Sequence, residues 1–128
     1  MPTKKDVFLG IKNLLDANIP EVSSRIYSSF PKKKYTLPLI VISNVSHSFG
    51  ERSLSGKFYR THYSIDVEVY TKTAQELDEI SEKVSMVLRD NQVQGRYPEA
   101  VGDIDNLEFV DDNNKIIHKR TIAVTYAY

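Results

Sequence analysis

Two acidic side chains at alternate positions of one segment are the residues best suited to acid–base chemistry. Asp66 and Glu68 lie two positions apart, and in an extended strand this spacing puts both on one face. Such a pair of carboxylates can act as a general acid and a general base. However, they alternate with Arg60 and His62, and mixed charges in this pattern are typical of a solvated or subunit-contacting face. We therefore predict an interface role for Asp66 and Glu68.

Metal ligation and cofactor binding are poorly supported by the remaining polar residues. His47, His62 and His118 lie on three separate segments without metal-ligand spacing. The run from Asp111 to Asn114 lacks the glycine and closing glutamate of an EF-hand, so turn formation explains it better. The chain has no phosphate-binding glycine loop, nucleophile elbow or zinc-protease helix. The sequence therefore predicts a non-enzymatic protein without catalytic residues, cofactor or metal.

A nucleic-acid-binding surface is the next alternative. Its candidates are the basic run Lys32 to Tyr35 and the aromatic residues between Phe58 and Tyr63. An RNA-recognition sheet needs exposed aromatic residues in a motif that Gly56 to Tyr59 resembles only loosely. The formal net charge is zero, whereas dedicated nucleic-acid binders usually carry a basic surplus. A small nucleic-acid-binding α+β module stays an alternative, and we expect no specific nucleic acid as partner.

The charges are unevenly distributed along the chain. Residues 1–72 contain 11 Lys/Arg and 6 Asp/Glu, a balance of +5, whereas residues 73–128 contain 6 and 11, a balance of −5. Two arrangements follow from this split. The two halves can pack together and neutralise each other, or the basic surface of one subunit can meet the acidic surface of its neighbour.

Length and composition indicate one domain over residues 1–128. The chain is 41% hydrophobic and 27% charged, which is typical of a globular fold. Its longest apolar run, Leu39 to Ile42, is far shorter than a transmembrane helix, and the N-terminal residues lack the pattern of a signal peptide. The absence of cysteine excludes disulfides and fits synthesis in a reducing cytoplasm.

Two amphipathic helices are predicted. The first spans about residues 4–17, with Thr3 as the N-cap, Asp6 near the positive end of the dipole and Pro20 beyond its end. The second spans residues 73–90 and opens with the capping box Thr73 to Glu76. Each helix carries one apolar stripe. The stripes are Val7, Phe8, Ile11, Leu14 and Leu15 in the first helix, and Leu77, Ile80, Val84, Val87 and Leu88 in the second.

Strand patterns occupy most of the remaining chain. A weak strand is expected at 25–30, and the β-branched run 37–48 predicts a strand that is buried on both faces at its start. Residues 49–57, rich in glycine and serine, favour a flexible connection. Residues 58–70 alternate between apolar and polar side chains, as a half-buried antiparallel strand does.

The C-terminal part predicts a closing hairpin. Residues 91–103 are polar and irregular, and two strand patterns follow at 104–110 and 115–126, joined by a turn at 111–114. The strand pattern continues to the last residue, which implies that the terminus is docked in the sheet. The predicted fold is α+β, with a mostly antiparallel sheet, two helices packed on one face and the element order α-β-β-β-α-β-β.

This series of elements resembles the tail-terminator and tail-completion (head–tail joining) family of siphophages. The resemblance rests on the opening helix that leads to Ile26-Tyr27-Ser28-Ser29-Phe30-Pro31, on Leu37-Pro38-Leu39-Ile40-Val41-Ile42, on the strand Tyr63-Ser-Ile-Asp-Val-Glu-Val-Tyr70 that runs into the capped helix, and on the closing hairpin. Together these features cover nearly all of the chain. They form a shared pattern rather than a diagnostic signature.

The resemblance implies a structural virion protein, made in the host cytoplasm, at the head-proximal end of a phage tail. It would form a homohexameric ring that caps the tail tube and joins it to the head connector, and DNA can pass through such a ring. Its partners would be further copies of itself, the tail-tube protein and the head-connector protein, without a membrane. The expected interface residues are Lys32, Lys33, Lys34, Phe49, Glu51, Arg52, Leu54, Lys57, Arg60, Asp66 and Glu68.

Three alternatives remain open at this point: another head–tail connector or tail-tube subunit, the nucleic-acid-binding module, and an enzyme whose site is not readable from the sequence. We also expect residues 46–57 to be mobile in the free subunit and to become ordered on assembly, because Gly50, Ser53, Ser55 and Gly56 lie between two strands.

Overall fold

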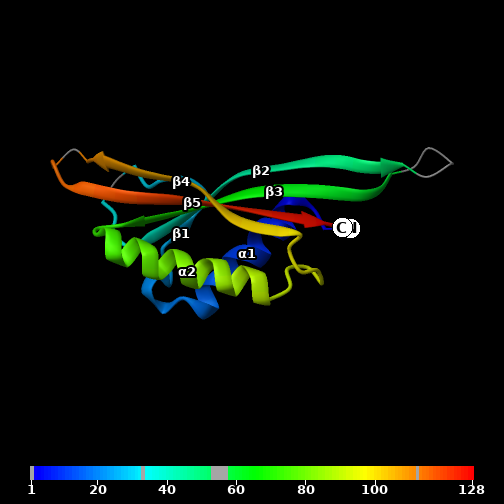
Figure 1. Cartoon of the computed structure of the whole chain (residues 1–128), viewed down its shortest axis with the longest axis horizontal. Helices are drawn as coiled ribbons and strands as arrows, with labels where there is room; N and C mark the ends of the chain where they lie inside the picture. The colour runs from blue at the N-terminus through cyan, green and yellow to red at the C-terminus, as the bar shows by residue number, and fades with distance from the viewer. Residues whose placement is uncertain (1, 33, 53–57, 112) are drawn as a thin grey trace.

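The structure is a computed structural model of the chain that describes residues 2–32, 34–52, 58–111 and 113–128. The side chains of residues 44, 45, 47–52 and 58–60 lie outside this description. Two helices and a twisted sheet form its two layers (Figure 1). In the described chain, no helix is both long and apolar enough to cross a lipid bilayer.

The sheet contains five strands in the order β1-β2-β3-β5-β4. The short β1 (Ile26–Tyr27) runs parallel to β2 (Leu39–Arg52), and all other pairs are antiparallel. The helices α1 (Lys4–Asn18) and α2 (Ala74–Asp90) lie on the same side of the sheet (Figure 1). The predicted α+β class, the element order and the placement of both helices on one face are therefore confirmed.

The helix N-termini differ from the prediction in one detail. In α1 the Thr3 hydroxyl accepts a hydrogen bond from the Asp6 N–H at 3.2 Å, and the Asp6 carboxylate accepts one from the Thr3 N–H at 2.9 Å. The bond from the Thr3 backbone lowers the pKa of Asp6. In α2 the Thr73 hydroxyl accepts from the Glu76 N–H at 3.1 Å. One carboxylate oxygen of Glu76 is buried without a partner in the described chain. The complete capping box thus lies in α1, whereas the one predicted for α2 is only half formed.

The larger hydrophobic core lies between the helices and the sheet. The predicted helix stripes supply much of it, with Ile11 and Leu15 from α1 and Val84 and Leu88 from α2 fully buried. The facing side of the sheet contributes Ile40, Ile42, Tyr63, Ile65, Val67, Val69, Ile122, Val124 and Tyr126. The alternating apolar face predicted for β3 (Phe58–Thr71) is therefore the face on which the helices pack.

A second, smaller core lies on the opposite face of the sheet. Leu39, Val41, Tyr70 and Ile117 are buried there, under the segment that joins β1 to β2. This segment adds the partly buried apolar side chains of Phe30, Tyr35 and Leu37, and β1 adds Tyr27. The prediction that the strand beginning near Leu37 is buried on both faces is confirmed. From the sequence we also expect the two helices on one face of the sheet to account for every apolar stripe, and this is wrong because the connecting segment covers the other face.

The long hairpin of β2 and β3 replaces the expected flexible connection. Strand pairing continues through Phe49↔Thr61 and Arg52↔Phe58, with register shifts on the way. Residues 49–52 are therefore strand rather than loop, and residues 53–57 lie outside the described chain. The paired strands extend past the helices toward one end of the molecule (Figure 1), and we call the paired residues 49–52 and 58–61 the arm. The proposed ordering of residues 46–57 on assembly stays a prediction.

β4 is longer than predicted, whereas β5 has the predicted length and is shifted by one residue. β4 covers Ala100–Val110, so residues 100–103 join the sheet instead of belonging to an irregular segment. The strand β5 (Ile116–Ala127) supplies the hydrogen-bond partners for the backbone of these residues. The polar sequence around them gave no indication of this pairing. The terminal Tyr128 exchanges two backbone hydrogen bonds with Thr61, which confirms that this terminus is docked in the sheet.

Gly10 lies where α1 approaches the loop after α2. A Cβ atom at this position would lie 2.8 Å from Cγ1 of Val93, a buried core side chain. We expect Gly10→Ala to lower the free energy of unfolding by about 1–2 kcal/mol, because overpacking outweighs the gain of about 1 kcal/mol in helix propensity. Urea unfolding of Gly10→Ala, Val93→Ala and the double variant measures this. The double variant should be less destabilised than the sum of the single ones, and simple additivity would contradict the predicted close contact.

Candidate assembly surfaces

One edge of the sheet is formed by β4 along its whole length. β4 is the last strand in the sheet order and, among the described strands, pairs only with β5. Every residue of β4 except Val101 is exposed, including the large apolar side chains Ile104, Leu107, Phe109 and Val110. An exposed edge strand that carries apolar side chains is a template for pairing with another chain.

The backbone groups that point outward from β4 follow from its ladder. The Asp111 N–H donates to the Lys115 carbonyl at 2.9 Å, so this pair is hydrogen-bonded across the hairpin. Hydrogen-bonded and non-hydrogen-bonded pairs alternate in an antiparallel ladder. The Phe109–Ile117 pair is therefore hydrogen-bonded, and the next pair, Glu108 with His118, is not. Glu108 consequently directs its backbone N–H and C=O away from β5.

The opposite edge of the sheet is also largely open. β1 pairs with β2 at Ile40 and Val41 only. Beyond Val41, no other described strand pairs with that side of β2, which continues to Arg52 in the arm. Two unpaired edges of different sequence therefore lie on opposite sides of one sheet.

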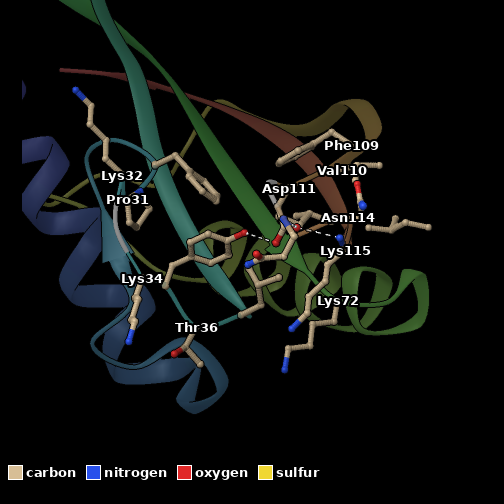
Figure 2. Close-up of a pocket in the computed structure, with 16 residues that line it drawn as sticks. Pro31, Lys32, Lys34, Thr36, Lys72, Phe109, Val110, Asp111, Asn114 and Lys115 are labelled. Atoms are coloured by element: carbon tan, nitrogen blue, oxygen red, sulfur yellow. Dashed lines mark hydrogen bonds between the residues drawn. The ribbon is translucent and has the colours of Figure 1, made fainter.

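A third surface is a hollow on the sheet face that does not carry the helices. It lies between residues 30–37 and the β4–β5 turn (Figure 2). Its rim carries four lysines, Lys32, Lys34, Lys72 and Lys115, all of them exposed. Its apolar lining includes Phe30, Leu37, Phe109, Val110, Ile116 and Ile117. We call it the lysine-rimmed hollow.

Asp111 holds the two walls of the hollow together. Its carboxylate accepts hydrogen bonds from the Tyr35 hydroxyl at 3.0 Å and from the N–H groups of Asn113 and Lys115, each at 2.9 Å (Figure 2). The bond from the Lys115 backbone is the main cause of a lowered pKa at Asp111. This carboxylate is ionised at neutral pH and is occupied by donors of the protein itself.

The aromatic residues near the hollow contact one another edge to face. The ring of Phe30 lies 5.0 Å from that of Tyr35, 4.8 Å from that of Tyr70 and 6.5 Å from that of Phe109, centroid to centroid. Such geometry stabilises an aromatic cluster. The segment before β2 is thereby attached to the sheet, and the cluster forms the base of the hollow.

Glu68, one of the two carboxylates noted in the sequence, contacts side chains of its own subunit. The Glu68 carboxylate lies 3.0 Å from the ammonium of Lys119, and both side chains are mostly buried. Glu68 also accepts a hydrogen bond from the Tyr70 hydroxyl at 3.3 Å. Burial, followed by the charge of Glu68, raises the pKa of Tyr70. Glu68 is therefore engaged within its own subunit, whereas its contribution to an interface stays a prediction.

Of the three histidines, His62 and His118 contact different glutamates, and the backbone of His47 pairs with Tyr63, next to His62. His62 faces Glu99 at 3.3 Å and His118 faces Glu108 at 3.5 Å, in different parts of the sheet, and the side chain of His47 lies outside the description. Among the described residues, no group of three or more His, Asp or Glu side chains could hold a metal ion.

The predicted interface residues fall in three places rather than one. Lys32 and Lys34 lie at the hollow, and Asp66 and Glu68 lie on the sheet face away from the helices. The backbones of Phe49, Glu51, Arg52 and Arg60 belong to the arm, whereas Lys33, Leu54 and Lys57 lie outside the described residues. Sequence reasoning missed Lys72, Lys115 and the apolar residues of β4, since only folding brings them to the hollow or to an edge.

Within the described residues, two lysine–glutamate ion pairs join the basic half (residues 1–72) to the acidic half (residues 73–128). Lys83 pairs with Glu21 at 2.8 Å, and Lys119 pairs with Glu68 at 3.0 Å. Each joins a basic residue of the acidic half (73–128) to an acidic residue of the basic half (1–72). These two pairs leave the charge balance of each half unchanged, so both arrangements that follow from the split stay predictions.

The residues suggested for nucleic-acid binding do not come together. Tyr63 is buried, and its hydroxyl donates to the Pro2 carbonyl at 2.6 Å. Tyr35 contacts the β4–β5 turn at one end of the molecule, whereas Phe58 pairs with Arg52 in the arm at the other. In the part of the chain that the structure describes, Tyr35 of the basic run and the backbone of Phe58 therefore lie at opposite ends of the molecule.

Comparison with known proteins finds similarity in fold rather than in sequence. No family model and no curated protein sequence matches the chain. Among solved structures, the fold is similar to a chain from the virion of a native gene transfer agent particle, with a TM-score of 0.62 and 9% identity. The match covers 90% of this chain and 89% of that one. Nearly the whole fold is thus shared with a component of a phage-like virion, at an identity that establishes the fold alone.

Proposed function

We propose that this chain is a structural virion protein of the tail-terminator type, which forms a ring, most simply a hexamer, at the head-proximal end of a phage tail. The observation that carries the proposal is the pair of unpaired edges on opposite sides of the sheet. The likeness to a gene transfer agent virion chain and the order of elements in the sequence support it. The ring would cap the tail tube and face the head connector.

The two edges meet the geometric requirement of a closed ring. A ring needs a heterologous contact, in which one patch of a subunit meets a different patch of the next. The β4 edge of one subunit and the β2 edge of its neighbour are such patches. Ile104 and Leu107 would supply apolar contact area, and the surplus charges would guide encounter and register. Exposed ion pairs contribute only about 0–1 kcal/mol each, so apolar and backbone contacts must supply most of the affinity.

Glu108→Pro tests the edge contact. Proline removes an N–H that points away from β5, so the hairpin keeps its own ladder while the outer edge loses a donor. The concentration needed to form rings should rise at least about tenfold, since the lost bond recurs at every interface. Native mass spectrometry over a concentration series measures this. Glu108→Ala is the matched control, because it also removes the contact with His118 but keeps the N–H.

The assignment as a terminator needs a second assay, with purified tail tubes of the parent particle. The wild-type chain should bind tube ends and stop elongation, and Glu108→Pro should lose this activity while Glu108→Ala keeps it. A chain that lengthens the tubes would instead be a tail-tube subunit. A strict monomer at high concentration that also leaves tube ends uncapped would overturn the proposal.

A further inference from the structure

We infer that the lysine-rimmed hollow is a docking site for an acidic peptide segment with aromatic or aliphatic side chains, contributed by a virion protein stacked on that end of the ring. The inference rests on the proposed ring for its geometry. The chemistry of the occupant follows from the hollow itself.

The four exposed lysines give the rim of the hollow a positive charge, which favours binding of an anionic ligand. Within the described chain, none of the four rim lysines forms an ion pair with a carboxylate of the protein. They come from three segments, with Lys32 and Lys34 before β2, Lys72 after β3 and Lys115 before β5. In Figure 2, Lys72 and Lys115 extend in the same direction. The carboxylate of Asp111 is already held by Tyr35 and by two backbone N–H groups.

The apolar lining of the hollow favours a ligand that also carries apolar side chains. Phe109, Val110 and Ile116 are all exposed there, and their burial would stabilise a complex. The volume of the hollow is about 1380 Å³. Small-molecule sites usually measure roughly 300–1,000 Å³, so an open hollow of this size suits a length of polypeptide better.

The position of the hollow indicates which kind of protein would supply this segment. It lies at the β4–β5 turn, at the end of the molecule opposite the arm (Figures 1 and 2). If neighbouring subunits meet through the backbone edge of β4, the sheet face that carries the hollow, with Lys72 and Lys115, lies beside this lateral contact rather than within it. The hollow therefore remains open to a protein stacked above or below the ring.

Nucleic acid is the competing class of anionic occupant, and the aromatic residues argue against it. Single-stranded nucleic acid binds by stacking its bases on exposed aromatic faces. Here Phe30 packs edge to face with Tyr35, Tyr70 and Phe109, so these rings are occupied with one another. Exposed apolar side chains such as Val110 and Ile116 also offer nothing to a phosphate backbone.

Fluorescence polarisation with defined probes tests the inference. The probes are a fluorescein-labelled peptide Glu-Phe-Glu-Leu-Glu-Phe-Glu, its twin with every Glu replaced by Gln, and single-stranded DNA carrying the same label. The hollow variant is Lys72→Glu with Lys115→Glu. Its matched control is Lys4→Glu with Lys5→Glu, which makes the same change of charge at two exposed lysines of α1. Val110→Ser tests the apolar lining separately.

The wild-type protein and the α1 variant should bind the acidic peptide equally. The hollow variant should bind it at least about tenfold more weakly, and the Gln twin should bind the wild type weakly as well. Equal binding by both double variants, no binding by the wild type, or tighter binding of DNA than of the acidic peptide would each overturn the inference. Native mass spectrometry of the hollow variant separates this question from ring assembly, because its rings should form as in the wild type.

Discussion

Ile80→Asp is expected to unfold the protein or nearly so. Ile80 lies in α2, is only 2% exposed and belongs to the core between the helices and the sheet. The substitution removes about 1.5–3 kcal/mol of stabilisation from apolar burial. It also places a carboxylate in the hydrophobic core, where the neighbouring side chains are apolar. Together these costs approach or exceed the total stability of about 5–15 kcal/mol typical of a domain.

Met86→Asp is the matched control for this experiment, because it introduces the same charge in the same helix at a side chain that is 46% exposed. Circular dichroism should show a cooperative melting transition for Met86→Asp and its loss for Ile80→Asp. An Ile80→Asp protein that melts like the wild type would show that α2 does not pack on the sheet as described.

Ile117→Ala should destabilise the protein by about 2–4 kcal/mol through the second core. Ile117 is 1% exposed and lies with Leu39, Val41 and Tyr70 on the sheet face away from the helices. Truncation removes buried apolar area and leaves a cavity, because the strands on either side cannot collapse into the space. For a chain of this size the melting temperature should fall by roughly 10 °C.

The adjacent Ile116 provides a control of identical chemistry. It is 55% exposed, so Ile116→Ala should change the free energy of unfolding by no more than about 0.5 kcal/mol. Chemical denaturation of both variants, with equal m-values, gives the comparison. Equal destabilisation by the two substitutions would mean that the second core does not stabilise the fold.

The sequence by itself determined most of the elements and their order. The spacing of apolar residues predicted both helices to within a residue or two, because the 3.6-residue period depends only on the local chain. The alternation in residues 58–70 likewise identified the helix-facing side of β3, since side chains alternate between the two faces of any strand. The α+β class followed from these local patterns.

Several features depended on contacts between distant residues, and only the tertiary structure decided them. Residues 49–52 and 100–103 look irregular in sequence, but they are strand because a neighbouring strand supplies their backbone partners. The second core required Phe30 and Ile117 to meet across the sheet. Which strand edge stays open depends on the order of the strands, and local periodicity carries no information about that order.

The candidate surfaces show the same division. The sequence drew attention to Lys32 and Lys34 but gave no reason to join them with Lys72 and Lys115, which lie far away along the chain. The Tyr35 hydroxyl donates a hydrogen bond to Asp111 across 76 positions of sequence, and this contact joins the two walls of the hollow. A local pattern reports which side chains share a face of one element. Which elements become neighbours is set by burial of the whole chain, and so the surfaces available for assembly were decided only by the folded structure.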